Sequence, residues 1–193
     1  MKCYIEITLL PSGDITSYFL WGKVYQQLHL ALVEIQDSNH KVKVGISFPD
    51  YDADSYQLGC KLRLFSQSRE VLERLNVNKW FSRLSDYTHI TSIRDVPEPV
   101  DGHAFFKRVQ PKSSNERLAR RKAKREGVSY EQALAHYDGR KEQRSKAPFV
   151  YIKSQSSGER YRLLIDRLDA EVSQVEGRFS TYGLSSSSSV PLF

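Results

Sequence analysis

The side chains whose type and spacing point most directly to a chemistry are basic, and they lie in one stretch. Between Lys107 and Arg125 nine residues are basic and one, Glu116, is acidic, a net charge of +8 in a chain whose total is +6. The rest of the chain therefore sums to −2. Such a local excess of positive charge is typical of a surface that meets a polyanion.

This basic stretch carries helix signals of its own. Ser113 followed by Glu116 is a capping-box pattern and Gly127 is a typical helix stop, so we expect a helix over 114–126. Five basic residues then fall on one face of it: Arg117, Arg120, Arg121, Lys124 and Arg125. A solvated charged helix is the alternative. Because like charges at i, i+4 repel by roughly a few tenths of a kcal/mol per pair, we favour a nucleic-acid partner.

Composition argues against several other classes of protein. The chain has no run of about 18 apolar residues, which excludes a membrane span. Its first ten residues lack the apolar segment and cleavage site of a signal peptide, so we expect a cytoplasmic protein. Cys3 and Cys60 are expected to be reduced core residues. The five histidines show no ligand spacing with one another or with these cysteines, and we predict no metal site and no cofactor.

Hydrophobic periodicity predicts an α+β chain. Strands are expected at 3–9, 42–48, 61–65 and 87–96, a long amphipathic helix at 15–35, and a second helix after Ser68 that breaks near 76–78. The order β-α-β-β-α-β is the split ferredoxin-like motif. Because proteins with this motif have many different functions, the motif alone does not indicate the function of this chain.

A second domain is expected after the prolines at 97 and 99. We place a ferredoxin-like domain at 1–98 and a C-terminal α/β domain at 99–193. The second domain would hold a strand at 103–110, the basic helix, a short helix started by Ser129 and Gln132, and a hairpin of 149–153 with 160–165. The five serines at 185–189 are expected to form a flexible loop.

Four short motifs, in order along the chain, resemble one known family. They are GISFPD at 45–50, RVQ at 108–110 before the arginine-rich helix, KSQSSG at 153–158, and YGLS at 182–185 before a final VPLF. This pattern resembles the CRISPR-associated endoribonuclease of type I-F systems, which cuts the long CRISPR transcript at the base of each repeat hairpin. The resemblance implies two kinds of partner, the repeat RNA hairpin and other Cas subunits of a surveillance complex, and no membrane.

The resemblance also implies metal-independent cleavage in which the ribose 2′-hydroxyl attacks the adjacent phosphate. The products would carry a 2′,3′-cyclic phosphate and a 5′-hydroxyl. A histidine suits the proton transfer because its ordinary pKa is about 6.5. Carried over from the family, the catalytic roles fall on His29, on Ser154, which would hold the 2′-hydroxyl, and on Tyr182, which would orient the histidine.

The position of the catalytic histidine has two alternatives. The segment reads LWGKVY at 20–25 and LHLAL at 28–32, so a gapless match with the family places Tyr25 there and a four-residue insertion places His29 there. Four residues are close to one helical turn, so both side chains share a face. We choose His29, because tyrosine with a pKa of about 10 is a poor proton acceptor.

RNA recognition is implied in the same way. Arg108 suits a guanine edge and Gln110 an adenine edge, whereas the basic helix would contact phosphates. Tyr161 matches an aromatic residue that stacks on the closing base pair. The remaining RNA-binding residues carried over are Lys112, Gln155 and Ser156. Two other functions stay open: a hairpin-binding subunit that does not cleave, and a duplex-DNA binder.

Overall fold

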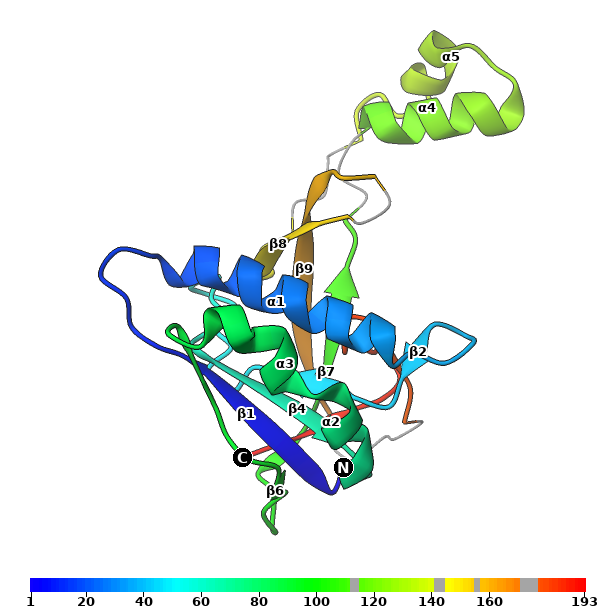
Figure 1. Ribbon diagram of the computed structural model, residues 1–193. Helices are drawn as coiled ribbons and strands as arrows, with labels where there is room; N and C mark the ends of the chain where they lie inside the picture. Colours follow the sequence, from blue (N-terminus) through cyan, green and yellow to red (C-terminus); the bar gives the residue numbers. More distant parts are fainter. Residues whose placement is uncertain (112–114, 141–144, 155–156, 171–176) are drawn as a thin grey trace. The chain divides into compact units, whose positions relative to one another are not determined.

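A computed structural model describes residues 1–111, 115–140, 145–154, 157–170 and 177–193 (Figure 1). By their internal contacts the residues fall into two compact units. The first combines 1–108 with 147–193, and the second is 109–146. The predicted boundary after residue 98 thus lies inside the first unit, and an independently folding domain at 1–98 stays a prediction.

The first unit is a mixed α/β structure whose N-terminal part has the predicted element order. Its elements are β1 (Cys3–Leu9), α1 (Ser17–Glu34), β3 (Gly45–Ser47), β4 (Lys61–Ser66), α2 (Arg69–Leu75), α3 (Val77–Phe81), a short 3-10 turn η1 (Ser82–Leu84), β5 (Thr88–Ile90) and β6 (Arg94–Asp95). The strands form an antiparallel sheet in the order β3-β4-β1-β5, with β6 also paired to β1. Figure 1 shows α1, α2 and α3 on one face of this sheet.

Helix α1 is the central element of the unit. Thr16 caps its first turn, since the Thr16 hydroxyl accepts a hydrogen bond from Phe19 N at 3.4 Å. The buried residues recur at helical spacing: Leu20, Trp21, Val24, Tyr25, Leu28, Ala31 and Leu32. Burying such a stripe against the sheet holds the helix in place far more strongly than helix propensity does.

The C-terminal part of the first unit shares this core. Strands β7 (Gly102–Val109), β8 (Phe149–Lys153), β9 (Arg160–Ala170) and β11 (Val190–Leu192) form a second sheet in the order β11-β7-β9-β8. Phe106, Ile165 and Phe179 belong to the same buried cluster as Leu28 and Phe48. The two sheets therefore pack around one hydrophobic core.

The strand predicted at 42–48 is divided in two. Its first piece, β2 (Lys41–Val42), pairs with β10 (Phe179–Ser180), and its second piece, β3, pairs with β4. The serine tract also differs from the predicted flexible loop. Ser188 and Ser189 are buried, and the Ser185 hydroxyl accepts hydrogen bonds from the amides of Ser187 and Ser188 at 3.2 and 3.0 Å. These bonds make the tract a structured turn.

The second unit is a helical hairpin of α4 (Asn115–Glu126) and α5 (Tyr130–Ala135). Helix α4 matches the predicted basic helix and ends before Gly127, whose φ of +67° suits a glycine stop. Ser129 and Gln132 form the predicted capping box of α5. Ala119 and Ala133, one on each helix, are fully buried. The predicted cap residue Ser113 lies outside the described residues.

Two composition-based expectations can be compared with the described residues. Cys3 lies in the core, but Cys60 is exposed, so the expectation of two core cysteines is wrong for Cys60. None of the helices in the described part of the chain has the length and apolar character needed to cross a membrane.

Candidate active site and RNA-binding residues

His29 and Tyr182, two of the three predicted catalytic residues, are in direct contact. Their rings are stacked, with centroids 4.3 Å apart and planes inclined by 8°. His29 lies on α1 near its C-terminal half, and Tyr182 lies in the turn that follows β10. The packing of α1 and of the C-terminal segment on one core brings together two residues that are far apart in sequence.

A backbone contact determines which imidazole nitrogen carries the proton. His29 Nδ1 lies 2.8 Å from the carbonyl oxygen of Thr181. Because a carbonyl can only accept, Nδ1 is the donor, and the neutral ring therefore has its lone pair on Nε2. Burial lowers the pKa of His29 from its ordinary value, although the Thr181 carbonyl acts in the opposite direction. A half-buried, neutral imidazole with a basic Nε2 is suited to accept a proton near neutral pH.

Tyr25, the alternative to His29 for the catalytic position, has a structural role. Its ring is fully buried, and its hydroxyl donates a 2.8 Å hydrogen bond to the carbonyl oxygen of Tyr182. Burial, and secondarily the neighbouring Tyr182 and Tyr161, raise the pKa of Tyr25 well above its ordinary value. Tyr25 therefore stays protonated and supports the turn that carries Tyr182.

Tyr161 and Arg108 complete a cluster around Tyr182. The hydroxyls of Tyr161 and Tyr182 are 2.6 Å apart and share a hydrogen bond. Burial and this bond raise the pKa of Tyr161. The Arg108 guanidinium lies 5.5 Å from the Tyr161 ring centroid and 5.6 Å from that of Tyr182, within cation–π range of both. We call His29, Arg108, Tyr161 and Tyr182 the tyrosine–histidine cluster.

Two glycines allow β10 and the turn at 181–184 to lie close against β3. Gly183 has φ +72°, and a Cβ added to it would lie 2.5 Å from Ile46 Cγ2. A Cβ on Gly45 would lie equally close to the Phe179 ring, at 2.5 Å. The Ile46 amide also donates to the Gly183 carbonyl at 3.1 Å. Two of the sequence motifs, at 45–50 and 182–185, therefore meet at this contact.

Ser154, the third predicted catalytic residue, lies at the end of β8 in the turn toward β9. Its amide donates to the Glu159 carbonyl at 2.8 Å, and its hydroxyl accepts from the Ser157 amide at 3.2 Å. The preceding residue, Lys153, donates its amide hydrogen to Gln26 Oε1 at 2.8 Å. Gln26 lies three residues before His29 on α1, so this bond ties the Ser154 turn to the helix that carries His29.

The predicted phosphate-binding side chains lie on α4 and are exposed: Arg117, Arg120, Arg121, Lys124 and Arg125. Two glutamates partly neutralise the helix. Glu116 pairs with Arg120 at 3.3 Å, and Glu126 pairs with Lys122 and with Arg125, each at 2.7 Å. Exposed pairs of this kind contribute about 1 kcal/mol or less and exchange readily for other anions.

Gln110 lies just beyond β7 at the start of the second unit. Lys112, Gln155 and Ser156, also predicted to bind RNA, lie outside the described residues.

Comparison with known proteins shows the family to which the chain belongs. A family model described as CRISPR-associated protein (Cas_Csy4) matches residues 4–193. The chain belongs to the Cas_Csy4 family. Two curated relatives, from Escherichia coli (strain UTI89 / UPEC) and Pseudomonas aeruginosa (strain UCBPP-PA14), are each named CRISPR-associated endonuclease Cas6/Csy4. Each is 34% identical over 193 residues, the whole of this chain and of the relative. The resemblance found in the sequence motifs is confirmed.

Two solved structures are more distant matches. One is titled "An RAMP protein binding different RNA substrates", with a TM-score of 0.38 at 11% identity over all of both chains. The other is titled "Characterization of a Cas6-related gene from Pyrococcus furiosus", with a TM-score of 0.37 at 10% identity over all of this chain and 99% of that one. Scores at this level do not establish a shared fold.

In this Cas_Csy4 chain, two residues that support the candidate site, Thr181 and Gln26, were not predicted from the sequence. Thr181 acts on His29 through its backbone carbonyl, which any residue type would supply. The side-chain oxygen of Gln26 accepts a hydrogen bond from the Lys153 amide at the edge of a strand, and Lys153 is 127 residues away in the chain. Neither role has a sequence signature, because both depend on how distant segments pack.

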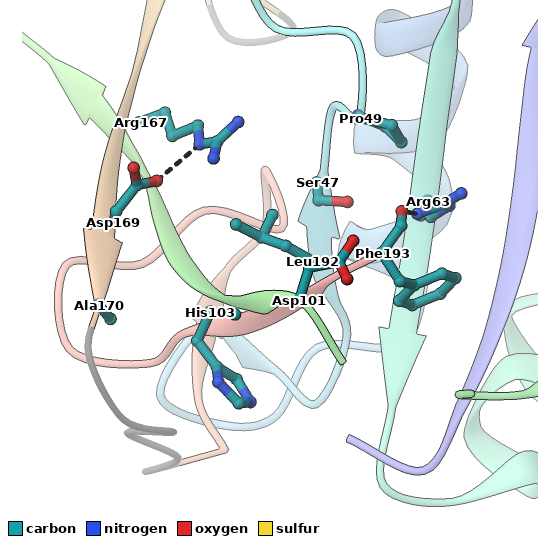
Figure 2. A pocket seen from close by; sticks show the side chains of 11 residues that line it. Ser47, Pro49, Arg63, Asp101, His103, Arg167, Asp169, Ala170, Leu192 and Phe193 are labelled. Atoms are coloured by element: carbon teal, nitrogen blue, oxygen red, sulfur yellow. Dashed lines mark hydrogen bonds and ion pairs between the residues drawn. The ribbon is translucent and has the colours of Figure 1, made fainter. Parts of the chain in front are cut away.

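A pocket of about 530 Å³ lies elsewhere in the Cas_Csy4 chain, beside the end of β11 (Figure 2). Figure 2 shows Phe193 next to Arg63, whose guanidinium lies 4.1 Å from the Phe193 ring centroid and also pairs with Glu6 at 2.7 Å. An ion pair of Arg167 with Asp169, at 2.8 Å, flanks the pocket. Its lining includes no predicted catalytic or RNA-binding residue, so we do not assign it to the candidate site.

Proposed function

We propose that this protein is a metal-independent endoribonuclease that recognises and cleaves the CRISPR repeat hairpin. The Cas_Csy4 membership and the endonuclease names of two full-length relatives support this proposal. The observation that carries it is the placement of His29, stacked on Tyr182 and held by the Thr181 carbonyl with Nε2 as the basic nitrogen.

In the proposed reaction, the ribose 2′-hydroxyl on the 5′ side of the cut attacks the adjacent phosphorus. His29 Nε2 takes the hydroxyl proton as the new bond from the 2′ oxygen to phosphorus forms. The bond from phosphorus to the 5′ oxygen breaks, and the leaving oxygen takes a proton from water to become the 5′-hydroxyl. The products are a 2′,3′-cyclic phosphate and a 5′-hydroxyl. Ser154 would hold the 2′-hydroxyl in line, and Tyr182 would keep the imidazole oriented.

The geometry favours His29 over Tyr25 for the proton transfer. The Tyr25 hydroxyl is buried and donates to a carbonyl, and its raised pKa makes it a weaker acid and leaves it without a basic form near pH 7. His29 is half-buried and has a nitrogen whose lone pair is not used by Thr181. We therefore assign the catalytic position on α1 to His29.

The proposed recognition divides between base contacts and phosphate contacts. Arg108 and Gln110 would read guanine and adenine at the foot of the hairpin, and Tyr161 would stack on the closing base pair. The exposed face of α4, with Lys112, Gln155 and Ser156, would contact the backbone. We further propose that the protein keeps the 3′ hairpin of the product and joins other Cas subunits in a type I-F surveillance complex.

The test is single-turnover cleavage of the cognate repeat hairpin in EDTA. Wild type should cut, and the new ends should be a 2′,3′-cyclic phosphate and a 5′-hydroxyl. His29→Ala should lower the rate by about 10² to 10⁴ while hairpin affinity stays the same. A strict need for a divalent metal, a 3′-hydroxyl product, or full activity of His29→Ala would contradict the proposal. Binding without any cleavage by wild type would instead indicate a hairpin-binding subunit.

A further inference from the structure

A second feature of the first unit is a basic groove next to the tyrosine–histidine cluster. It is a pocket of about 550 Å³ whose lining includes four cationic side chains, Lys41, Lys107, Arg108 and Arg178, and the serines at 185–187. Within the described part of the chain, its lining contains no acidic residue. The residues predicted for hairpin binding include only Arg108 from this set, so the groove is largely unassigned.

The β2–β10 ribbon positions two of the cations. Lys41 lies directly opposite Ser180 in the antiparallel register. Arg178 precedes Ser180 by two residues, so its side chain points to the same face of the ribbon. The intervening Phe179 and its partner Val42 point to the opposite face and are buried in the core. Lys41 and Arg178 are therefore directed away from the core, and the buried side chains of Phe179 and Val42 hold the ribbon in place.

The serine turn also lines the groove and is anchored as well. The Ser185 amide donates to the Phe106 carbonyl of β7 at 2.9 Å. Ser188 is buried, and its hydroxyl lies within hydrogen-bond distance of both the amide and the carbonyl of Arg178, at 3.4 and 3.3 Å. Ser186 and Ser187 remain exposed. The turn thus presents hydroxyl groups beside the cations, the combination that proteins commonly use for phosphate oxygens.

The charge of the groove is only partly compensated. Lys107 pairs with Asp166 of β9 at 3.6 Å, and Arg108 stands over the two tyrosine rings. Asp37 lies near the outer end, where its carboxylate accepts from the Lys41 amide at 2.9 Å. Lys41 and Arg178 have exposed side chains. Among the described residues, Asp166 and Asp37 therefore offset only part of the charge of the four cations that line the groove.

The groove adjoins the tyrosine–histidine cluster. Tyr182 and Arg108 belong to both. Among the described residues, His29, Ser154 and Tyr161 do not line the groove. A strand that passes through the site has the stem and the attacking 2′-hydroxyl on one side of the scissile phosphate and the leaving 5′ oxygen on the other. Since Tyr161 is assigned to the stem side, the groove lies on the leaving side.

We propose that this groove binds the single-stranded RNA that continues 3′ of the scissile phosphate, with Lys41 and Arg178 on its phosphates. This inference rests on the proposed function. It assigns a binding site for the RNA segment that is released, and only Arg108 is shared between this site and the contacts proposed to hold the hairpin.

The experiment compares three RNAs that carry a 2′-deoxy nucleotide at the cut and so cannot be cleaved. One is the bare hairpin, one has six more nucleotides at its 3′ end, and one has six more at its 5′ end. Dissociation constants are measured over a range of KCl concentrations for wild type, for Lys41→Ala/Arg178→Ala, and for a matched control. The control, Arg83→Ala/Arg94→Ala, also removes two exposed positive charges from the first unit, on η1 and β6.

For wild type and the control, we expect the 3′ extension to tighten binding about tenfold at low salt and to steepen the salt slope by about 1.4, since each neutralised phosphate of a single strand adds about 0.7. The groove variant should bind the bare hairpin as wild type does. With the 3′ extension it should show neither the tighter binding nor the steeper salt slope. Equal affinity for the bare and 3′-extended hairpins in wild type would overturn the proposal, as would a gain that survives in the groove variant or appears only with the 5′ extension.

Failure of the proposed function would look different. If the proposed hairpin recognition fails, wild type will not bind the bare hairpin at all, and both proposals will fall together. Tight binding of the bare hairpin with no effect of the extension would overturn the groove assignment alone. Loss of bare-hairpin binding in the groove variant would show that the groove is not a separate site, which also contradicts the proposal.

Discussion

At the scale of single residues, Tyr182 connects Tyr25, His29 and Tyr161. Its carbonyl accepts from Tyr25, its ring stacks on His29, and its hydroxyl bonds to Tyr161. Each contact uses a different group of the same residue. The substitution made at Tyr182 therefore decides which contact is lost, because a phenylalanine keeps the stacked ring and an alanine does not.

The first prediction concerns pH. Burial lowers the pKa of His29, so the imidazole loses its proton below its ordinary value of 6.5. The base-competent neutral form accumulates as pH rises through this lowered pKa and is lost as pH falls through it. We expect the single-turnover rate of cleavage to rise with pH, to reach half its plateau below pH 6.5, and then to level off. A half-maximum above 6.5 would contradict the role assigned to His29.

The second prediction separates the stacked ring from the hydroxyl. Tyr182→Phe and Tyr161→Phe remove the same hydrogen bond from its two ends, so each should slow cleavage by less than about tenfold, and the double variant should be no slower than either single one. Tyr182→Ala should slow cleavage about 100-fold, because the imidazole loses its support. Single-turnover rates measure all four, and additive effects of the two phenylalanine substitutions would contradict the shared bond.

The sequence predicted residue types better than it predicted contacts. His29, Ser154, Tyr161 and Tyr182 were all selected through the family resemblance, and three of them meet in one cluster. The hydrogen bond between Tyr161 and Tyr182 and the tautomer set by Thr181 were not predicted. The first depends on the turn at 181–184 lying beside β9, and the second on the same turn docking against a helix 152 residues earlier in the chain. Local sequence patterns contain no such information.

At the scale of elements, α1 serves both the core and the site. One face is buried against the sheet, and Gln26 near its middle bonds to the exposed edge of β8. β8 is the last strand of its sheet, and an uncovered edge strand has unpaired backbone groups. The helix satisfies one of these groups at Lys153, next to Ser154.

The third prediction tests this edge contact. Gln26→Ala should lower the free energy of unfolding by about 1 kcal/mol and speed hydrogen exchange at the Lys153 amide. Gln27→Ala is the matched control, because Gln27 lies on the same helix but lines a pocket with Trp80 and Leu84. Urea denaturation and amide exchange measured by NMR provide the two readouts. Equal protection of the Lys153 amide in both variants would refute the proposed role of Gln26.

The fourth prediction concerns α4. Arg121→Ala removes an exposed charge from the basic face, so it should weaken binding to all hairpins alike and flatten the salt slope by up to about 0.9. Gln110→Ala should leave the slope unchanged and relax the preference at one base pair by about 1–3 kcal/mol. Competition binding with variant hairpins at several salt concentrations distinguishes the two. The same response to both substitutions would contradict the division into base and phosphate contacts.

Helices were easier to predict than strands for a physical reason. Helices α1, α4 and α5 depend on local caps and periodicity, and each lies within about two residues of its expected position. The expected strand at 42–48 splits, because Val42 pairs with Phe179 and Ile46 pairs with Leu64. Which strands pair depends on the whole fold. The conformation of the serine tract also depends on the fold, because the Ser188 hydroxyl donates to the Arg178 carbonyl.

At the scale of the whole molecule, the two compact units differ in charge and in packing. Residues 109–146 hold eleven basic and five acidic side chains, a net charge of +6 that equals the charge of the entire chain. Their described residues include only two fully buried side chains, Ala119 and Ala133. The first unit has no net charge outside them and contains the extensive hydrophobic core.

The fifth prediction follows from this difference. Amides of α4 and α5 should exchange with solvent much faster than those of α1, because local opening of a small helical hairpin exposes little apolar surface. Adding the repeat hairpin should slow exchange in α4 and leave the core of the first unit nearly unchanged. Exchange measured by mass spectrometry, with and without RNA, gives the comparison. Equal protection of α4 and α1 in the free protein would contradict it.

The hydrogen bond from His29 to Thr181 has a consequence for protein synthesis. A ribosome makes α1 early and the turn at 181–184 about 150 residues later, at roughly 5–20 residues per second. During most of that interval a nascent chain has a histidine without the carbonyl that fixes its tautomer and without the tyrosine ring that holds it. Cleavage activity should therefore begin only when the turn at 181–184 has left the exit tunnel and docked on β3. Incomplete chains on polysomes should not cut CRISPR transcripts.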